Sequence, residues 1–204
     1  MKSSAGMLLI FKECAYLIID FRYIEKARNT VKNCTVMEQE NLTEQINSLM
    51  KKHNAKSLAV ESMDMTLSRM SFLEKKFPDI EFIKSDELSN NIYDMRTIKS
   101  TEEIEKIHKA QKIAEKAFDE ILGFIRPGVT EREIALKLDN CMLENGAEGL
   151  SFETIALAGA NTSMPHGVPG NYKVKNGDFV LMDFGAVYDG YHSDMTRTVC
   201  VGQS

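Results

Sequence analysis

The pair Asp189-Gly190 lies between two runs of apolar and β-branched residues, and no other feature constrains the fold of this chain as much. An Asp-Gly pair in that setting is the strongest short-range signal for a β-hairpin. With a two-residue turn at this pair, Asp183 faces Thr196 and Gly185 faces Asp194. The sequence therefore predicts an antiparallel hairpin over residues 180–199.

In this register the two aspartates, Asp183 and Asp194, project from one sheet face as diagonal neighbours. Such neighbours have Cα atoms about 7–8 Å apart, which suits two cations separated by about 3.5–4 Å. The entering strand, residues 178–186, is otherwise apolar on both faces, which predicts a sheet interior. A carboxylate buried there needs a metal, a cation or hydrogen bonds to compensate it.

Structural roles for both aspartates stay open beside the metal site. Asp183 could be a buried acid bonded to backbone amides or to Arg197, and Asp194, after Ser193, could be an Asx-type turn residue. Spacing alone supports these roles and a metal site about equally. The nearby His192 lies close to the turn, and we expect it to face solvent.

A second informative segment is the loop of residues 158–170, where His166 stands between Pro165 and Gly167. Function is over-represented on such constrained, exposed backbone. The near-neutral pKa typical of histidine suits proton donation or a hydrogen bond to a developing oxyanion. Taken alone, a loop histidine is more often only solvated. His53 and His108 fall on predicted helices and are expected to be structural.

Composition excludes several classes of protein. The net charge is −5 with no block of Lys or Arg, which argues against nucleic-acid binding. The longest apolar stretches, residues 7–11 and 16–19, are too short to cross a bilayer, and no signal peptide is evident. The four cysteines form no CxxC pair, so we expect them to be reduced in a cytoplasmic protein.

The first half alternates short strands with helices, which predicts an α/β fold with βαβ units and a mostly parallel sheet. Asp20 is predicted to cap a helix at residues 21–29. The expected strands are residues 7–11, 14–20, 34–37, 57–60 and 80–83, and the other helices are residues 42–52 and 66–77. The polar run 85–91 ends this pattern and predicts a domain boundary near Asp94, hence domains 1–93 and 94–204.

The second half changes to an α+β pattern. Ser100 with Glu103, and Thr130 with Glu133, are capping boxes that open two amphipathic helices. The first helix is predicted to stop at residues 127–128 and the second at residues 145–146. A strand near residues 152–157, the histidine loop and the hairpin follow.

These residues together resemble a known family, the pita-bread metallopeptidases, in its Xaa-Pro aminopeptidase and Xaa-Pro dipeptidase branch. The resemblance rests on residues 182–186 with 191–198, 151–155 with 165–167, 95–104, and 4–10 with 15–18 and 20–23. It implies a partial creatinase-type N-terminal domain followed by the first part of a pita-bread catalytic domain. The creatinase-like first half argues against a methionine aminopeptidase.

The resemblance also implies an activity and a site. Asp183 would chelate one ion, Asp194 would bridge two, and His166 would bind substrate and stabilise the tetrahedral intermediate. Two divalent ions, manganese with cobalt or zinc as substitutes, would activate a hydroxide that attacks the bond before proline. The substrate would be a peptide with proline at its second position. No other cofactor site is implied, and a homodimer stays open.

The chain departs from the family pattern, because the family's further His and two Glu ligands would lie beyond Ser204. Met1 likewise falls where the first domain should be under way. We therefore expect a chain truncated at both ends, prone to aggregation through an open sheet face and edge, and without peptidase activity. The alternative is a non-enzymatic pita-bread protein or fragment that binds a peptide or protein partner.

Overall fold

The computed structural model of the protein describes residues 6–202. The chain divides into two compact units, Met1–Thr97 and Ile98–Ser204, and each is described by itself. Ser4 and Ala5, which belong to the resembling segment at the start of the chain, lie outside the described residues. The architecture is mixed α/β, as predicted. The domain ranges 1–93 and 94–204 stay a prediction.

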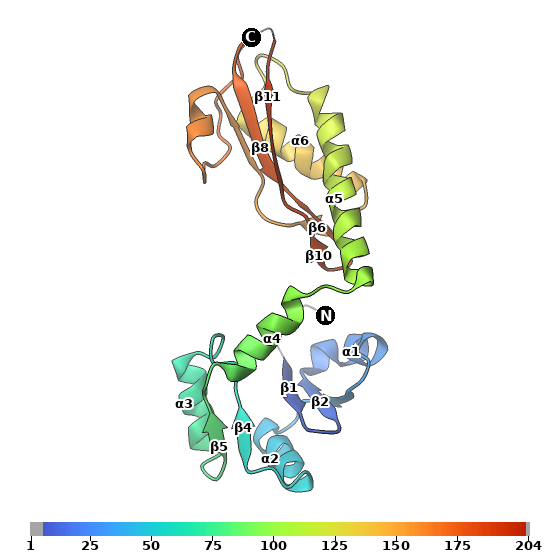
Figure 1. Ribbon diagram of the computed structural model, residues 1–204, viewed down its shortest axis with the longest axis vertical. Coiled ribbons are helices and arrows are strands. Elements are labelled where there is room, and N and C mark those ends of the chain that lie inside the picture. Colours follow the sequence, from blue (N-terminus) through green and yellow to red (C-terminus); the bar gives the residue numbers. More distant parts are fainter. Residues whose placement is uncertain (1–5, 203–204) are drawn as a thin grey trace. The chain divides into compact units, whose positions relative to one another are not determined.

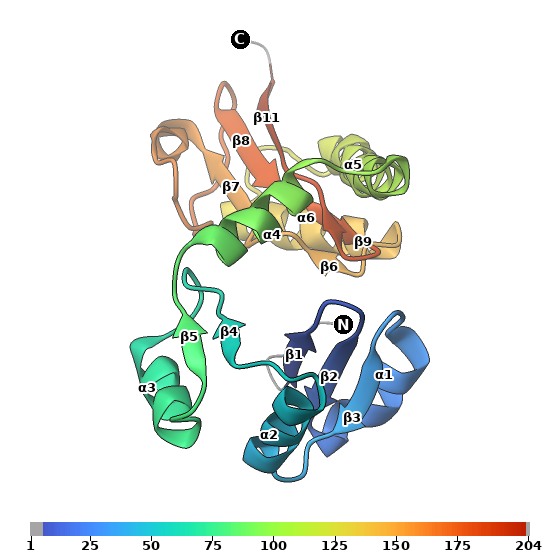
Figure 2. The ribbon, with the colours of Figure 1, turned by 60° about the horizontal axis from the view of Figure 1, so that its bottom comes forward.

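The first unit contains two small sheets (Figures 1 and 2). Its strands are β1 (Gly6–Ile10), β2 (Ala15–Ile19), β3 (Thr35–Glu38), β4 (Ser57–Ala59) and β5 (Glu81–Ile83). β1 pairs with β2 as an antiparallel hairpin, whereas β2–β3 and β4–β5 are parallel pairs. The predicted, mostly parallel pairing is confirmed for two of the three strand pairs, whereas the strands lie in two sheets and not in one.

The helices of the first unit follow the predicted pattern with two differences. They are η1 (Phe21–Tyr23), α1 (Ile24–Thr30), α2 (Leu42–Lys52), α3 (Leu67–Lys76) and α4 (Glu87–Thr97). Asp20 caps a 3-10 turn, not the α-helix, by accepting a hydrogen bond from Arg22 N. The helix α4 was not predicted, because the polar run 85–91 was interpreted as the end of the first pattern, although Leu88, Ile92 and Met95 recur at helical spacing along it.

The core of the first unit lies between its strands and helices, and His53 belongs to this packing as expected. Its ring stacks on Phe11 with centroids 4.2 Å apart. Its Nε2 lies 3.0 Å from the Tyr16 hydroxyl, which also accepts a hydrogen bond from Lys52 Nζ at 3.1 Å. No helix within residues 6–202 is long and apolar enough to span a membrane.

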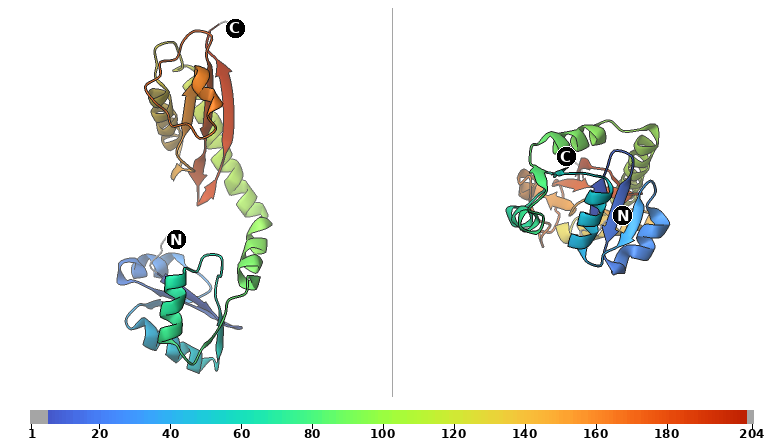
Figure 3. Two further views of the ribbon diagram at one scale, coloured as in Figure 1. Left: turned by 90° about the vertical axis from the view of Figure 1, so that its left-hand side faces the viewer. Right: turned by 90° about the horizontal axis from the view of Figure 1, so that it is seen from below.

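Two helices with complete capping boxes open the second unit. They are α5 (Thr101–Leu122), capped by Ser100 and Glu103, and α6 (Glu131–Glu144), capped by Thr130 and Glu133. The helix α5 ends earlier than predicted, at Leu122 followed by Gly123, and α6 ends at Glu144 with Asn145 as its C-cap, which matches the predicted stop. In Figure 3, α5 (yellow-green) runs alongside the strands of its own unit.

The strands of the second unit form two three-stranded sheets, in the orders β11-β8-β7 and β10-β9-β6. Figure 2 shows β8 between β7 and β11. The strands are β6 (Gly149–Leu150), β7 (Ile155–Ala158), β8 (Phe179–Phe184), β9 (Ala186–Tyr188), β10 (Tyr191–His192) and β11 (Met195–Cys200). The 3-10 helix η2 (Gly159–Ser163) follows β7. The predicted hairpin strand is thus divided at Gly185.

One face of the β11-β8-β7 sheet is fully buried along the central strand. Val180, Met182 and Phe184 are fully buried against α5 and α6. The intervening residues of β8 face the other way, where Phe179 is 57% exposed and Asp183 is half-buried. The predicted position inside a sheet is confirmed, because β8 is the central strand, although its Asp183 face is less buried than its other face.

The four cysteines are free thiols, as expected for a reduced chain. Cys141 is buried on α6, Cys14 and Cys34 are half-buried, and Cys200 is exposed. The cytoplasmic location that the cysteines suggested stays a prediction.

Candidate functional site

The hairpin turn has the geometry that its sequence demands. Asp189 and Gly190 have φ values of 45° and 76°, and positive φ at both central residues defines the type I′ turn favoured by hairpins. Tyr188 pairs with Tyr191, and Asp183 pairs with Thr196. The predicted register is confirmed at both ends of the hairpin.

Gly185 brings the two halves of the hairpin into close contact. A Cβ atom at this position would lie 2.0 Å from the carbonyl oxygen of Ser193, a distance that no side chain tolerates. The Gly185 carbonyl accepts a hydrogen bond from Ser151 N at 2.8 Å. The backbones of the two hairpin halves therefore approach each other closely at Gly185 and Ser193, next to Asp194.

Asp183 lies opposite Thr196, in the register predicted for it, and Asp194 lies between β10 and β11, two residues before Thr196; that both carboxylates share one face stays a prediction. Asp183 Oδ1 accepts a hydrogen bond of 2.8 Å from Thr196 Oγ1. Asp194 is exposed, and within residues 6–202 its carboxylate has no hydrogen-bond or ion-pair partner. Arg197 donates to the Thr196 carbonyl oxygen, so the alternative in which it bonds Asp183 is wrong.

Helix α5 fixes the residues on either side of Asp194. The Ser193 hydroxyl is buried, donates to the carbonyl oxygen of Ala110 at 3.2 Å and accepts from Ala186 N at 3.0 Å. On the other side, Gln111 Nε2 donates to Met195 Sδ at 3.2 Å. Asp194 thus points to solvent from backbone that is held at both neighbours.

The first turns of α5 also hold the tip of the hairpin. Lys106 Nζ lies 2.9 Å from Asp189 Oδ2, and the Tyr191 hydroxyl donates to Glu103 Oε1 at 2.7 Å. The hydrogen bond to Asp189, with a second to Glu102, raises the pKa of Lys106. His192 is exposed, as predicted. These contacts orient the hairpin and do not involve Asp183 or Asp194.

The loop that carries His166 folds over the same sheet face as Asp183. Leu157 and Leu181 are paired across β7 and β8, and Ile155 is paired with Asp183, so all four side chains share one face. Leu157 is nevertheless fully buried, because Gly167 lies against it and a Cβ there would meet Leu157 Cδ1 at 2.6 Å. His166 itself is exposed.

Glu131 is the residue of this region that sequence reasoning missed. It occupies the first position of α6, where an acidic residue reads as an ordinary N-terminal charge. In the structure it is only 2% exposed and accepts hydrogen bonds from both flanks of the histidine loop. No local pattern in the sequence distinguishes it from its neighbour Glu133.

Asp139 on α6 supports the entry to β7. Its Oδ1 accepts a 2.5 Å hydrogen bond from the buried Thr154 hydroxyl. Burial raises the pKa of the Asp139 carboxyl, and the bond from Thr154 opposes that change only in part. The ionised form is therefore disfavoured in the folded chain.

We expect Asp139→Asn to raise the stability of the second unit at pH 7. The pKa of the Asp139 carboxyl is higher in the folded chain than in the unfolded chain, where an aspartate has a pKa of about 3.9. The carboxyl therefore favours the folded chain below the unfolded pKa, and this contribution is lost as the pH rises through the folded pKa. The asparagine side chain keeps an acceptor for Thr154 and carries no charge at any pH. Urea denaturation from pH 7 down to pH 4 should show the variant's advantage shrinking, whereas the exposed Asp119→Asn shows none. A variant less stable than the parent at pH 7 would contradict this.

The donor chemistry of Asp183 and Asp194 fits a hard or borderline divalent cation, because both are carboxylates with unused lone pairs. Within residues 6–202, no group of three or more His, Cys, Asp or Glu side chains is placed to hold an ion. The two carboxylates would therefore need further ligands to complete a cation site.

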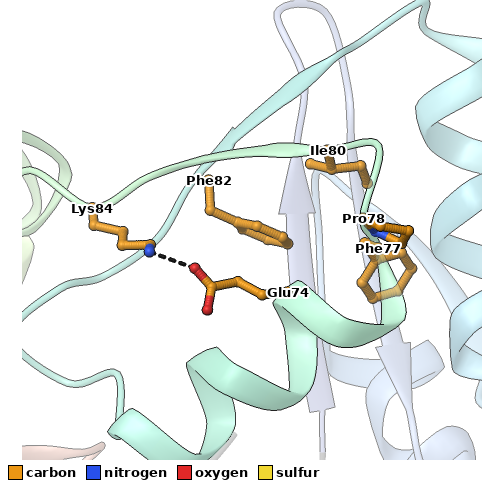
Figure 4. Close-up of a pocket in the computed structure, with 6 residues that line it drawn as sticks. All are labelled: Glu74, Phe77, Pro78, Ile80, Phe82 and Lys84. Carbon is orange, nitrogen blue, oxygen red and sulfur yellow. Dashed lines mark hydrogen bonds and ion pairs between the residues drawn. The ribbon is translucent and has the colours of Figure 1, made fainter.

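The pockets of the first unit do not contain these residues. One, of about 340 Å³, is lined by Glu74, Phe77, Pro78, Ile80, Phe82 and Lys84 (Figure 4). Its Glu74 carboxylate already pairs with Lys84 Nζ, as the dashed line shows. The other, of about 810 Å³, has mainly apolar walls from β1, β4 and α3. Neither brings together a set of groups suited to catalysis.

Comparison with known families divides the chain into two parts. Residues 1–98 match the Creatinase/Prolidase N-terminal domain, and residues 105–204 match Metallopeptidase family M24. The second match includes His166, Asp183 and Asp194.

Individual relatives are similar over nearly the whole chain. The Xaa-Pro dipeptidase of Pyrococcus horikoshii is 38% identical over 199 residues, 98% of this chain and 54% of the relative. A solved Xaa-Pro dipeptidase from Bacillus anthracis is 37% identical with a TM-score of 0.91, covering 100% of this chain and 56% of that one. The prolidase of Pyrococcus furiosus gives a TM-score of 0.83 at 33% identity, covering 98% and 57%. The chain thus spans about half the length of the relatives it matches.

Proposed function

Because the chain belongs to metallopeptidase family M24, in the Xaa-Pro peptidase group that carries a creatinase/prolidase N-terminal domain, we propose that it supplies part of a metal-dependent active site. The proposed residues are Asp183, Asp194 and His166. The observation that supports the proposal is the hairpin register, which pairs Asp183 with Thr196, two residues from Asp194, on the sheet face against which Gly167 of the histidine loop packs.

Each residue has a role that its surroundings support. Asp183 and Asp194 would hold divalent cations, for which manganese is the proposed choice because carboxylates dominate the ligand set. A cation bound there supplies Lewis acidity to the reaction. The Thr196 hydroxyl fixes one Asp183 oxygen and leaves the other free to ligate. The exposed His166 would donate a hydrogen bond to the substrate carbonyl oxygen.

The proposed substrate is a peptide with proline as its second residue. The support is the activity for which the relatives are named, Xaa-Pro dipeptidase and prolidase. Aminopeptidase and dipeptidase action would both use the same three residues. Since two carboxylates do not complete a dinuclear site, we further propose that the 204-residue chain alone has no turnover.

A chimera tests this proposal. Residues 1–204 would be joined to the part of the P. horikoshii dipeptidase that this chain does not match. With added Mn²⁺, we expect the chimera to hydrolyse an Xaa-Pro dipeptide at least about 100-fold faster than the matching Xaa-Ala dipeptide. The measurement is release of free proline or alanine.

The chain without the added part is the control, and it should release no proline above the uncatalysed rate. A folded chimera that does not discriminate Xaa-Pro from Xaa-Ala would contradict the substrate. Turnover by the 204-residue chain with Mn²⁺ would contradict its incompleteness.

A further inference from the structure

Glu131 connects the two ends of the loop that carries His166. Its Oε1 accepts hydrogen bonds from Ala158 N at 2.8 Å and from Asn161 Nδ2 at 2.9 Å. Its Oε2 accepts from Gly170 N at 3.0 Å. Ala158 ends β7 and precedes the loop, whereas Gly170 closes it. One carboxylate therefore bonds both flanks of residues 159–169.

The burial of this carboxylate is unusual and compensated. Glu131 is 2% exposed, and within residues 6–202 it forms no ion pair. Burying an unpaired charge is costly, but three N–H donors and the positive end of the α6 dipole act on it together. Hydrogen bonds to a charged acceptor are stronger than neutral ones, so this link is a firm one.

The other bonds of the loop do not perform this task. Inside the loop they are local, such as Met164 N to the Asn161 carbonyl oxygen and Gly167 N to the Met164 carbonyl oxygen, both 3.1 Å. Arg132 N donates to the Gly170 carbonyl oxygen and ties one flank to α6. Among the described residues, Glu131 alone forms side-chain hydrogen bonds to both flanks.

We propose that Glu131 is a positioning residue that holds His166 at the site. It acts through the loop and touches neither the aspartates nor the face on which substrate would bind. The catalytic meaning of this role rests on the proposed function, whereas the mechanical role does not. The loop would be ordered in the chain before any cation or peptide binds.

The test is NMR on the 204-residue chain as Glu131→Gln, with Glu133→Gln as the matched control. Glutamine has one acceptor oxygen, so one flank loses its acceptor and meets an N–H donor in its place. We expect the amide exchange rate at Ala158 or Gly170 to rise in the variant, relative to the parent, by a factor at least about ten times that at Met182 in the core. Order parameters of residues 164–168 should fall from about 0.85 toward 0.6. Glu133→Gln removes one acceptor at the same helix end and should leave the loop unchanged.

Three results would overturn the proposal: loop order parameters equal to the parent's, loss of protection equal in loop and core, or the same loop change in Glu133→Gln. If Glu131→Gln does not fold, Asn161→Ala provides a second test, because it removes only one of the three hydrogen bonds to Glu131. It should increase motion at residues 159–163 and leave Gly170 protected; a protected η2 would count against the proposal. None of these measurements requires turnover. An inactive chimera would therefore count against the proposed function only, and an unchanged loop in Glu131→Gln would count against the role of Glu131 only.

Discussion

Gly185→Ala is expected to unfold the β8–β11 hairpin or to destabilise the second unit by more than about 3 kcal/mol. The added methyl group would lie 2.0 Å from the Ser193 carbonyl oxygen and 2.9 Å from its carbonyl carbon. Both atoms are backbone, so no side-chain rotation relieves the clash. Typical overpacking costs about 1–3 kcal/mol where neighbours can adjust.

The neighbours of Gly185 cannot adjust without losing other bonds. Ser193 N donates to the Ala186 carbonyl oxygen at 2.9 Å, and the Ser193 hydroxyl donates to Ala110 on α5. Moving Ser193 away would break these contacts and leave buried polar groups unpaired, at about 1–3 kcal/mol each. The same movement would shift Asp194, so cation binding should fall with stability.

Gly149→Ala is the matched control, because no atom lies within 4 Å of the Cβ position at that strand residue. It should change the free energy of unfolding by no more than about 0.5 kcal/mol. Urea denaturation followed by circular dichroism gives the free energies, and amide exchange at Met182 localises the loss to the hairpin sheet. A Gly185→Ala chain as stable as Gly149→Ala would disprove the close approach.

The sequence predicted the hairpin well because its determinants are local. The register at Asp183 and Thr196 follows from turn length and strand alternation alone. The same holds for the capping boxes at Ser100 and Thr130. In each, the side chains of the cap and of the glutamate three residues later accept hydrogen bonds from each other's backbone N–H groups. Short-range chemistry of this kind can be read from residue order.

Features that depend on distant partners could not be predicted. Glu131 is defined by bonds to residues 27 to 39 positions later, and nothing near it in sequence marks it as buried. The apolar run of β8 predicts burial but not which face lacks a cover. Helix α4 was missed for a different reason, because four of its first five residues are polar and hid the helical spacing of Leu88, Ile92 and Met95.

The candidate site shows both behaviours. The positions of Asp183 and Asp194 followed from the hairpin, whereas the course of the His166 loop depends on Gly167 packing against Leu157. That contact joins a loop to a strand residue ten positions earlier, and no periodicity encodes it. Sequence alone could nominate His166 but could not place it over the sheet face of Asp183.

Asp183→Asn and Asp194→Asn are each expected to weaken Mn²⁺ binding to the 204-residue chain at least about tenfold. Each substitution removes one negative charge from the pair and leaves a weaker, neutral oxygen donor. Titration followed by the electron paramagnetic resonance signal of free Mn²⁺ measures the affinity directly. Asp119→Asn, on the exposed side of α5, carries the same change in charge and should bind as the parent does.

The double variant decides whether the two aspartates share one ion. If both carboxylates ligate the same cation, the second substitution should cost far less than the first, because the shared ion is already lost. Two independent sites would instead leave one intact site in each single variant and none in the double variant. Equal binding by the parent and by both single variants would remove the aspartates from the proposed site. The close approach at Gly185 and the contacts with α5 hold the backbone next to Asp194 before any ion binds. Strong coupling would therefore establish that the hairpin presents Asp183 and Asp194 as one binding unit.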